Sequence, residues 1–236
     1  MPIRKDPNYL HLTIGLVAAV VLATGAGSQV SLAIAGVLVA AITFLVTAWF
    51  VIESKRQFLL AGVLALTALA PFMWLVSQPE EQFPDLVEGL YVLNLAIWLL
   101  FTAYIATVAF RSILRAKLIR ANEIYGAIYV YLLIGVIFAE IFQLLLAWNP
   151  GAIYFDPARF QRPLAIRNNS LLTRSVGDLL YYSFVTLSTV GYGDVTPASP
   201  AARSLSLIEA VIGIMYVATM IARFVSIQTT EKFERS

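Results

Sequence analysis

The sequence predicts an all-helical membrane protein with six membrane-spanning helices and one shorter, re-entrant helix before the last of them. Composition is the first observation behind this fold class: 60% of the 236 residues are hydrophobic, 13% are charged, and the mean hydropathy is +0.81. A soluble domain carries about 25% charged residues, so this chain has too few of them to cover a surface in water. The second observation is that the apolar residues form six runs of about 20 residues, the length of a spanning helix. The third is a further apolar run that is too short to cross.

The six spans are separated by polar or turn-rich connectors. They cover residues 10–26, 31–52, 57–77, 89–110, 124–147 and 203–225. The first span is the weakest, because its basic start at Arg4 and Lys5 and the small residues near Ala26 also resemble a signal peptide. Both interpretations of this span stay open at the level of the sequence.

The basic residues predict how the spans are oriented. If the N-terminus is cytoplasmic and all six spans cross, 11 of the 16 Lys and Arg residues lie on the cytoplasmic side. These are Arg4, Lys5, Lys55, Arg56, Arg111, Arg115, Lys117, Arg120, Arg223, Lys232 and Arg235. Cytoplasmic loops carry an excess of Lys and Arg, so this orientation is the expected one. We therefore expect a multi-pass protein of the cell membrane, plasma or inner, with both termini in the cytoplasm.

Net charge and residue counts exclude several classes of function. A formal charge of +2 is far too small for a nucleic-acid-binding surface, so no nucleic acid partner is expected. The chain has no cysteine, which excludes disulfides, thiolate metal sites and thiol catalysis. It has one histidine, His11, which excludes a metal site built from several histidines. No cofactor is expected.

The short apolar run, residues 179–187, lies between the fifth and sixth spans. Ser175 and Asp178 precede it at the spacing of a helix start. The ten residues 179–188 form about 15 Å of helix, half of a bilayer, so the chain has to turn back at Thr189 to the side from which it came. A re-entrant helix with an extended return is tolerated at membrane depth only when it is buried in protein or lines a watery path.

The return segment carries Gly191 and Gly193, which alternate with bulky residues. Glycine readily adopts positive φ, and alternation of left- and right-handed conformations points successive carbonyls to the same side. The oxygens would come from Thr189, Val190, Gly191 and Tyr192, with the Thr189 hydroxyl in addition. Several copies of this row of carbonyl oxygens, arranged around an axis, could replace the water shell of a bare cation. The negative C-terminal end of the re-entrant helix would favour cations in the cavity below.

Residues 189–194, with the letters TVGYGD, resemble the signature filter of potassium channels. The preceding residues 181–188 are similar to the pore helix of that family, and the resemblance extends over its two-helix pore module, residues 124–227. The resemblance implies a homotetramer, because this chain holds one filter segment, and it implies K⁺ as the permeant ion. The ion-binding filter would consist of Thr189, Val190, Gly191, Tyr192, Gly193 and Asp194, with K⁺ held at the first four.

The same resemblance implies roles for residues around the filter. Tyr181, Tyr182 and Thr186 fall where the family packs its pore helix as a support for the filter, although the tyrosines can also be simple core aromatics. Gly213 matches a glycine of the inner helix that serves as a gating hinge. Family geometry also places a constriction near residues 219–224.

Three polar residues lie at costly depths in the last two spans: Glu140, Gln143 and Glu209. An ionised carboxylate at the bilayer centre costs at least ~2.5 kcal/mol. Glu209 lies one helical turn before Gly213 on the same face, and we expect it to reach the pore helix or the filter backbone and to support the filter. The alternative is a protonated, hydrogen-bonded packing residue with no effect on conduction. Glu140 is expected to be structural.

The charge pattern before the pore module argues against steep voltage sensing. Residues 1–110 are expected to form a four-helix domain laid out like a voltage sensor, but its fourth span, residues 89–110, contains no charge. The membrane potential acts on charge, at about 2.3 kcal/mol per charge per 100 mV. Basic and apolar residues follow the span instead and predict an interfacial linker helix over residues 111–123 that binds anionic lipid. Its basic residues are Arg111, Arg115, Lys117 and Arg120. Residues 228–236 are expected to form a cytoplasmic tail.

The sequence thus predicts a passive potassium-selective channel that is not an enzyme. One alternative is a non-conducting scaffold or accessory subunit. A weaker one is an intramembrane aspartyl protease of the GxGD type, because residues 191–194 fit that string. Its chemistry needs two carboxylates that share a proton, and every other aspartate of this chain falls outside the spans.

Overall fold

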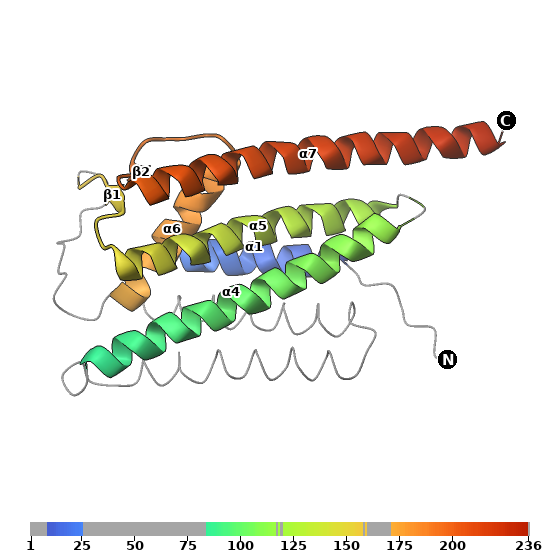
Figure 1. Ribbon diagram of the computed structural model, residues 1–236. Helices are drawn as coiled ribbons and strands as arrows, with labels where there is room; N and C mark the ends of the chain where they lie inside the picture. The colour runs from blue at the N-terminus through green and yellow to red at the C-terminus, as the bar shows by residue number, and fades with distance from the viewer. Residues whose placement is uncertain are drawn as a thin grey trace.

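The computed structural model describes residues 9–25, 84–116, 118, 120–157, 159 and 171–235 of the chain. Within these residues the fold is helical, with one two-stranded antiparallel sheet (Figure 1). The elements are α1 (Tyr9–Gly25), α4 (Pro84–Arg115), α5 (Ala121–Trp148), β1 (Ile153–Phe155), α6 (Leu171–Leu187), β2 (Val195–Pro197) and α7 (Pro200–Arg235). The second and third predicted spans, residues 31–52 and 57–77, lie outside the described residues.

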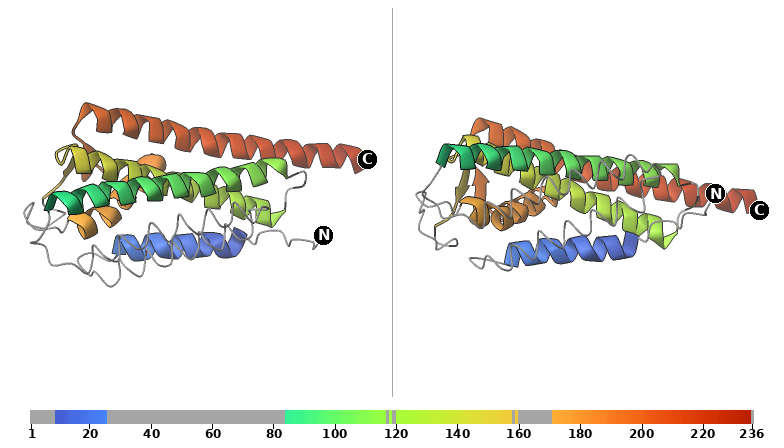
Figure 2. Two further views of the ribbon diagram at one scale, coloured as in Figure 1. Left: turned by 60° about the horizontal axis from the view of Figure 1, so that its bottom comes forward. Right: turned by 90° about the horizontal axis from the view of Figure 1, so that it is seen from below.

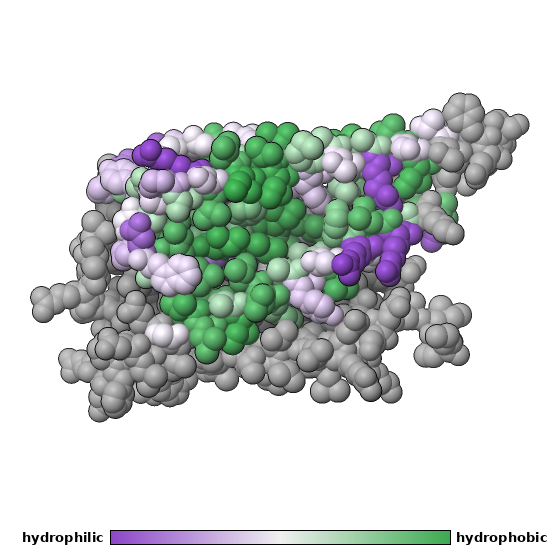
Figure 3. Space-filling model, viewed as in Figure 1, coloured by the Kyte–Doolittle hydropathy of each residue, from purple (hydrophilic) through white to green (hydrophobic). Residues whose placement is uncertain are grey.

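Three of the described helices are long and apolar enough to cross a membrane: Val92–Arg115, Ala121–Trp148 and Pro200–Ile227. They overlap the predicted fourth, fifth and sixth spans, so the structure agrees with a mostly helical membrane protein, and the full set of six spans stays a prediction. Helix α1 is apolar as well, but its 17 residues are fewer than the ~20 that cross a bilayer. Hydrophobic residues cover the middle of the face seen in Figure 3, and hydrophilic residues gather toward its two ends.

Helix α5 is the centre of the described fold. Helices α1, α4, α6 and α7 all pack against it, and the views of Figures 1 and 2 place α7 and α1 on different sides of it. The larger hydrophobic core joins α1, α4 and α5, and its fully buried side chains include Leu16, Phe101, Ile105, Tyr129 and Leu133. Burial of each such side chain contributes about 1.5–3 kcal/mol.

A second core holds α6 in place. It joins the C-terminal half of α5, both strands, α6 and the start of α7 through Phe142, Ile153, Leu179, Val195 and Ala202. The two strands are paired antiparallel with Tyr154 opposite Thr196, which ties the loop after α5 to the segment that follows the return from α6. This sheet was not among the elements predicted from the sequence.

The predicted linker helix over residues 111–123 is wrong as a separate element. Helix α4 continues through Arg111 to Arg115, and α5 already begins at Ala121. The cause is packing: Ile113 is buried in the larger core with 2% of its surface exposed, so α4 keeps its contact with α5 for another turn. Glu123 then starts α5, because its carboxylate accepts a hydrogen bond from the backbone N–H of Arg120 at 2.8 Å.

Helices α6 and α7 are both longer than predicted. Helix α6 begins at Leu171, before the expected start at Ser175. Helix α7 begins at Pro200, where the fixed φ of proline suits the first helical position, and the Ser199 hydroxyl accepts a hydrogen bond from the N–H of Ala202 at 3.1 Å. It then continues to Arg235, through most of the residues predicted to form a separate tail.

Arg223 of α7 binds the C-terminal end of α4. Its guanidinium donates hydrogen bonds to the backbone oxygens of Leu114 at 2.5 Å, Ala116 at 3.3 Å and Ile113 at 3.4 Å. The last carbonyls of a helix lack partners within the helix and carry partial negative charge. A cation from a neighbouring helix therefore satisfies them and fastens α4 to α7.

We expect Arg223→Ala to destabilise the protein by about 1–2 kcal/mol, because the last carbonyls of α4 lose both their donor and a favourable charge. Thermal unfolding of the detergent-purified protein measures the loss. Arg203→Ala is the matched control: Arg203 is exposed on the same helix and makes one long contact, 3.4 Å to the Pro197 oxygen. Equal unfolding temperatures for the two variants would contradict the capping role.

Candidate functional site

The site begins where α6 ends. The N–H of Thr189 donates to the oxygen of Thr186 at 2.9 Å, and the N–H of Val190 donates to that of Val185, also at 2.9 Å. The N–H of Gly191 lies 3.3 Å from the same Val185 oxygen. These bonds fold the chain back over the last turn of the helix, so the direction of the return segment is set by the position of α6.

The backbone of the return segment alternates in the sign of φ. Thr189 and Gly191 both have φ of 58° and Gly193 has φ of 79°, whereas Val190 and Tyr192 are not among the residues with positive φ. The two glycines thus have the conformation that the sequence analysis expected of them. Thr189 was not expected to share it, because a β-branched residue is rarely found at positive φ. No signal in the sequence identifies this position.

The segment is exposed on the isolated chain. Residues 189–193 all belong to the exposed class, and the apolar side chains of Val190 and Tyr192 expose 52% and 64% of their surface. Asp194, the next residue, is buried with 8% exposed. The segment 189–193 is therefore held at one end by α6 and at the other by Asp194, and its side chains are exposed in between.

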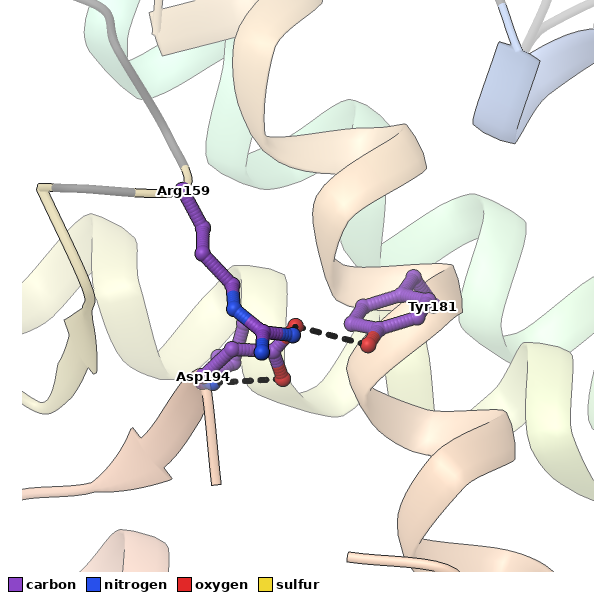
Figure 4. Close-up of polar contacts among 4 residues, drawn as sticks. Arg159, Tyr181 and Asp194 are labelled. Atoms are coloured by element: carbon purple, nitrogen blue, oxygen red, sulfur yellow. Dashed lines mark hydrogen bonds and ion pairs between the residues drawn. The ribbon is translucent and has the colours of Figure 1, made fainter. Parts of the chain in front are cut away.

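Asp194 is fixed by three groups from different parts of the chain (Figure 4). The Tyr181 hydroxyl donates to its Oδ2 at 2.7 Å, and the backbone N–H of Val195 donates to its Oδ1 at 3.1 Å. Arg159 lies 3.7 Å from Oδ2, but its side chain is 65% exposed, so this ion pair contributes little. The backbone oxygen of Asp194 also accepts a hydrogen bond from the N–H of Asp156 at 2.8 Å.

The two tyrosines of α6 have different surroundings. The ring of Tyr181 lies parallel to that of Tyr192, with 2° between the planes and 6.4 Å between the centroids, so Tyr181 contacts the return segment through both its ring and its hydroxyl. Tyr182 points into the second core, where its ring lies 5.0 Å from that of Phe142 and its hydroxyl lies 2.6 Å from that of Ser206. The geometry of Tyr182 favours the interpretation as a core aromatic.

We expect Tyr181→Phe to weaken the hold on Asp194, because the carboxylate loses its shortest hydrogen bond, a contact to a charged group worth about 1.5–3 kcal/mol. Thermal unfolding of the detergent-purified protein measures the loss. Tyr154→Phe, at an exposed tyrosine of β1, serves as the control. Equal unfolding temperatures for the two variants would contradict this role of the Tyr181 hydroxyl.

Glu209 is fully buried, with 0% of its surface exposed. Its Oε1 is hydrogen-bonded to the Ser183 hydroxyl of α6, so it reaches the helix predicted as the pore helix, one of the two partners that we expected. Within the described part of the chain, no hydrogen bond joins it to the backbone of residues 189–194. Glu140 instead faces α4, where the Thr102 hydroxyl donates to its Oε1 at 3.0 Å.

Gly213 permits a close approach between α7 and the end of α6. A Cβ atom at this position would overlap the backbone oxygen of Leu187 and lie 3.0 Å from the Cδ1 of the same residue. Helix α7 runs through Gly213 without interruption, so the structure gives the glycine a packing role. Its role as a gating hinge stays a prediction.

Among the residues that the structure describes, no group of three or more His, Cys, Asp or Glu side chains is placed to hold a metal ion. The backbone oxygens of residues 189–192 are the groups that the site offers to an ion.

Comparison with known proteins identifies the class to which this fold and site belong. Residues 126–229 match the model of a protein family described as "Ion channel". This range contains α6, the return segment and α7 up to Thr229, so the site lies in an ion-channel module of the membrane. Ion channels are not enzymes, and the assignment argues against the protease alternative.

The curated proteins that this chain resembles include potassium channels of several organisms. The voltage-gated potassium channel Kch of Escherichia coli is 30% identical over 168 residues, which are 69% of this chain and 34% of that protein. The two pore potassium channel c of Oryza sativa subsp. japonica is 46% identical over 54 residues, 23% of this chain and 12% of the relative. The human potassium voltage-gated channel subfamily KQT member 4 is 34% identical over 87 residues, 37% of this chain and 12% of the relative.

This chain is therefore a member of the potassium channel superfamily. It spans about a third or less of the length of the curated relatives that it matches. No solved structure matches the chain.

Proposed function

We propose that this protein is a potassium-selective channel that conducts K⁺ passively down its electrochemical gradient. The observation that carries the proposal is the alternating φ at Thr189, Gly191 and Gly193 directly after the end of a re-entrant helix. Alternation of this kind points successive carbonyls to one side, and rings of such carbonyls replace the hydration shell of K⁺ in selectivity filters. K⁺ would be held at residues 189–192, and Gly193 and Asp194 would complete the filter.

A homotetramer is part of this proposal. One chain offers oxygens to one side of an ion only, and the exposed side chains of Val190 and Tyr192 need cover from other copies. The surface of α7 supports the same conclusion. Its buried residues form a narrow stripe, and a wide apolar surface remains exposed for neighbouring subunits, the pore and lipid. That surface includes Leu207, Ile208, Val211, Ile214, Met215, Ile221 and Val225.

Flux measurements on purified protein in liposomes test the proposal. A channel of this kind should carry K⁺ down a gradient, Ba²⁺ should block the flux, and Na⁺ should pass far more slowly. Absence of flux from folded protein would favour the scaffold or accessory-subunit alternative. Equal flux of Na⁺ and K⁺ would show that residues 189–194 do not discriminate between the ions.

We further propose that conduction depends only weakly on voltage. Helix α4 carries no charged residue between Gly89 and Phe110, and its two arginines, Arg111 and Arg115, lie at its end. We expect a gating charge below roughly two per subunit, because a steep response needs charges that move across the field at about 2.3 kcal/mol each per 100 mV. Patch recordings of the open probability against voltage measure this charge, and a steeper dependence would contradict the proposal.

Orientation and lipid contact complete the proposal. Arg111, Arg115 and Arg120 are exposed around the connection from α4 to α5, whereas Lys117 lies outside the described residues. We place this end of the molecule at the cytoplasmic surface, where anionic headgroups attract basic residues at about 1 kcal/mol each. Both termini would be cytoplasmic and the protein would lie in the cell membrane. Activity in liposomes with and without anionic lipid tests the contact.

A further inference from the structure

Helix α7 touches α6 at three levels, one turn apart. Ser206 meets the Tyr182 hydroxyl, Glu209 meets the Ser183 hydroxyl, and Gly213 meets the Leu187 oxygen. Residues three and four apart share one face of a helix, so a single stripe of α7 follows the re-entrant helix to its end. Glu209 is the one ionisable residue of this stripe.

Ser183 is the point at which three helices meet. Its side chain is fully buried, and its hydroxyl oxygen lies 2.7 Å from the backbone oxygen of Gly135 in α5 as well as within hydrogen-bond distance of Glu209 in α7. A Cβ atom at Gly135 would lie 2.6 Å from the Phe184 ring, so α5 and α6 approach each other closely here. Helices α5, α6 and α7 are thus linked through one hydroxyl.

The number of hydrogens on each group sets the direction of the two hydrogen bonds at Ser183. A serine hydroxyl carries one hydrogen, and a backbone carbonyl can only accept, so the hydrogen of Ser183 goes to Gly135. The contact between Ser183 and Glu209 then needs its hydrogen from the carboxyl group. A neutral Glu209 also suits its surroundings, because its Oε2 has no hydrogen-bond partner in the described part of the chain and an ionised carboxylate there would be costly.

The linked residues lie directly before the candidate filter. Ser183 is two residues ahead of Val185, whose oxygen accepts the hydrogen bonds of Val190 and Gly191. A shift of this turn of α6 relative to α5 and α7 therefore moves the start of the filter. The chain of bonds from Glu209 through Ser183 to Gly135 fixes that turn.

We propose that Glu209 is a positioning residue of the ion pathway: its carboxyl group donates a hydrogen bond to Ser183, which donates to Gly135, and this chain holds the re-entrant helix at the position that the filter requires. The inference rests on the proposed channel function. It assigns Glu209 no contact with the permeant ion.

Four variants and one control test the inference. Glu209→Gln keeps a donor for Ser183, Glu209→Leu removes it, Ser183→Ala removes the hydroxyl that links Glu209 to Gly135, and the fourth combines Glu209→Leu with Ser183→Ala. Glu140→Leu is the matched control, since Glu140 also lies on a described helix with a buried Oε2 but contacts α4. The first readout is the ratio of K⁺ to Na⁺ flux in liposomes. The second is the infrared band of a protonated carboxyl group in the purified protein at neutral pH.

We expect Glu209→Leu and Ser183→Ala each to lower the flux ratio by roughly fivefold or more, Glu209→Gln to keep it, and Glu140→Leu to leave it unchanged. The flux ratio of the double variant should be no lower than that of the more severe single variant, because both substitutions remove the same hydrogen-bonded link. The protonated-carboxyl band should weaken in Glu209→Gln and shift in Ser183→Ala.

An unchanged flux ratio in Ser183→Ala or Glu209→Leu would overturn the inference, as would an equal fall in Glu140→Leu. So would an infrared band that Glu209→Gln leaves intact. If Glu209→Leu does not assemble, Ser183→Ala still gives both readouts. The infrared measurement needs no ion flux, so wild-type protein that shows the band without conducting K⁺ would refute the proposed channel function and leave the hydrogen-bond assignment standing.

Discussion

Gly213→Ala is expected to destabilise the protein by about 1–3 kcal/mol, the usual cost of forcing an extra carbon into a packed interior. The added Cβ would overlap the backbone oxygen of Leu187, and a backbone atom cannot move aside as the end of a side chain can. The displaced group is the last residue of α6, so ion flux should fall together with stability. Thermal unfolding in detergent and flux in liposomes measure the two effects.

Gly89→Ala is the matched control for this prediction. Gly89 also lies within a long helix, but in the part of the chain that the structure describes no packing neighbour lies within 4 Å of the Cβ that alanine would add. Alanine is the better helix former by about 1 kcal/mol, so this variant should be at least as stable as the wild type. A glycine that acts as a hinge alone would tolerate alanine without loss of stability, so a stable Gly213→Ala with altered gating would contradict the packing role.

Gly191→Ala should abolish selective K⁺ flux while the protein still folds. The glycine has φ of 58°, and no neighbouring atom of the described residues lies within 4 Å of the position of a Cβ, so alanine meets no obstacle among them. The effect comes from the backbone, because a left-handed conformation costs an L-residue roughly 1–2 kcal/mol. In the proposed tetramer that cost arises four times around one axis. We expect the segment to relax and the ring of oxygens at Gly191 to be lost.

Gly151→Ala is the control for this second prediction. Gly151 lies in the loop after α5, its φ is outside the left-handed range, and an added Cβ would meet its nearest neighbour, Asn149 Oδ1, at an ordinary 3.7 Å. Flux and selectivity should therefore remain at the level of the wild type. Normal K⁺ selectivity in Gly191→Ala would show that positive φ at this position is not needed for conduction.

Much of the site was accessible from the sequence because its residues are close together along the chain. A short apolar run followed by glycines at alternate positions predicts both the re-entrant helix and positive φ at Gly191 and Gly193. Thr189 could not be found in this way. Its positive φ is imposed by the hydrogen bonds that close the end of α6, and its β-branched side chain argues against that conformation.

Contacts between distant parts of the chain could not be predicted from the sequence. Arg223 and the end of α4 are about 110 residues apart, and nothing in either segment specifies the other. A carboxyl group at the depth of Glu209 signals a buried partner, which the sequence analysis recognised, but Ser183 is one of several polar residues on α6 that could have met it. The pairing of β1 with β2 involves three residues on each side, too few for a periodic pattern.

The linker between α4 and α5 was predicted wrongly for a different reason. Basic and apolar residues alternate over residues 111–120 in a way that suits an interfacial helix as well as the exposed and buried sides of a longer one. Only packing against a neighbouring helix decides between an interfacial helix and a longer one. Ile113 packs in the core shared with α5. Local periodicity cannot separate these cases.

The short stretch that joins α4 to α5 has a consequence for how subunits come together. Residues 116–120 can reach at most about 18 Å, and α4 packs against α5 of the same polypeptide. This helix pair therefore forms without an adjacent copy. In the proposed tetramer, each protomer would bring the pair already formed, so assembly around the common axis would join finished units.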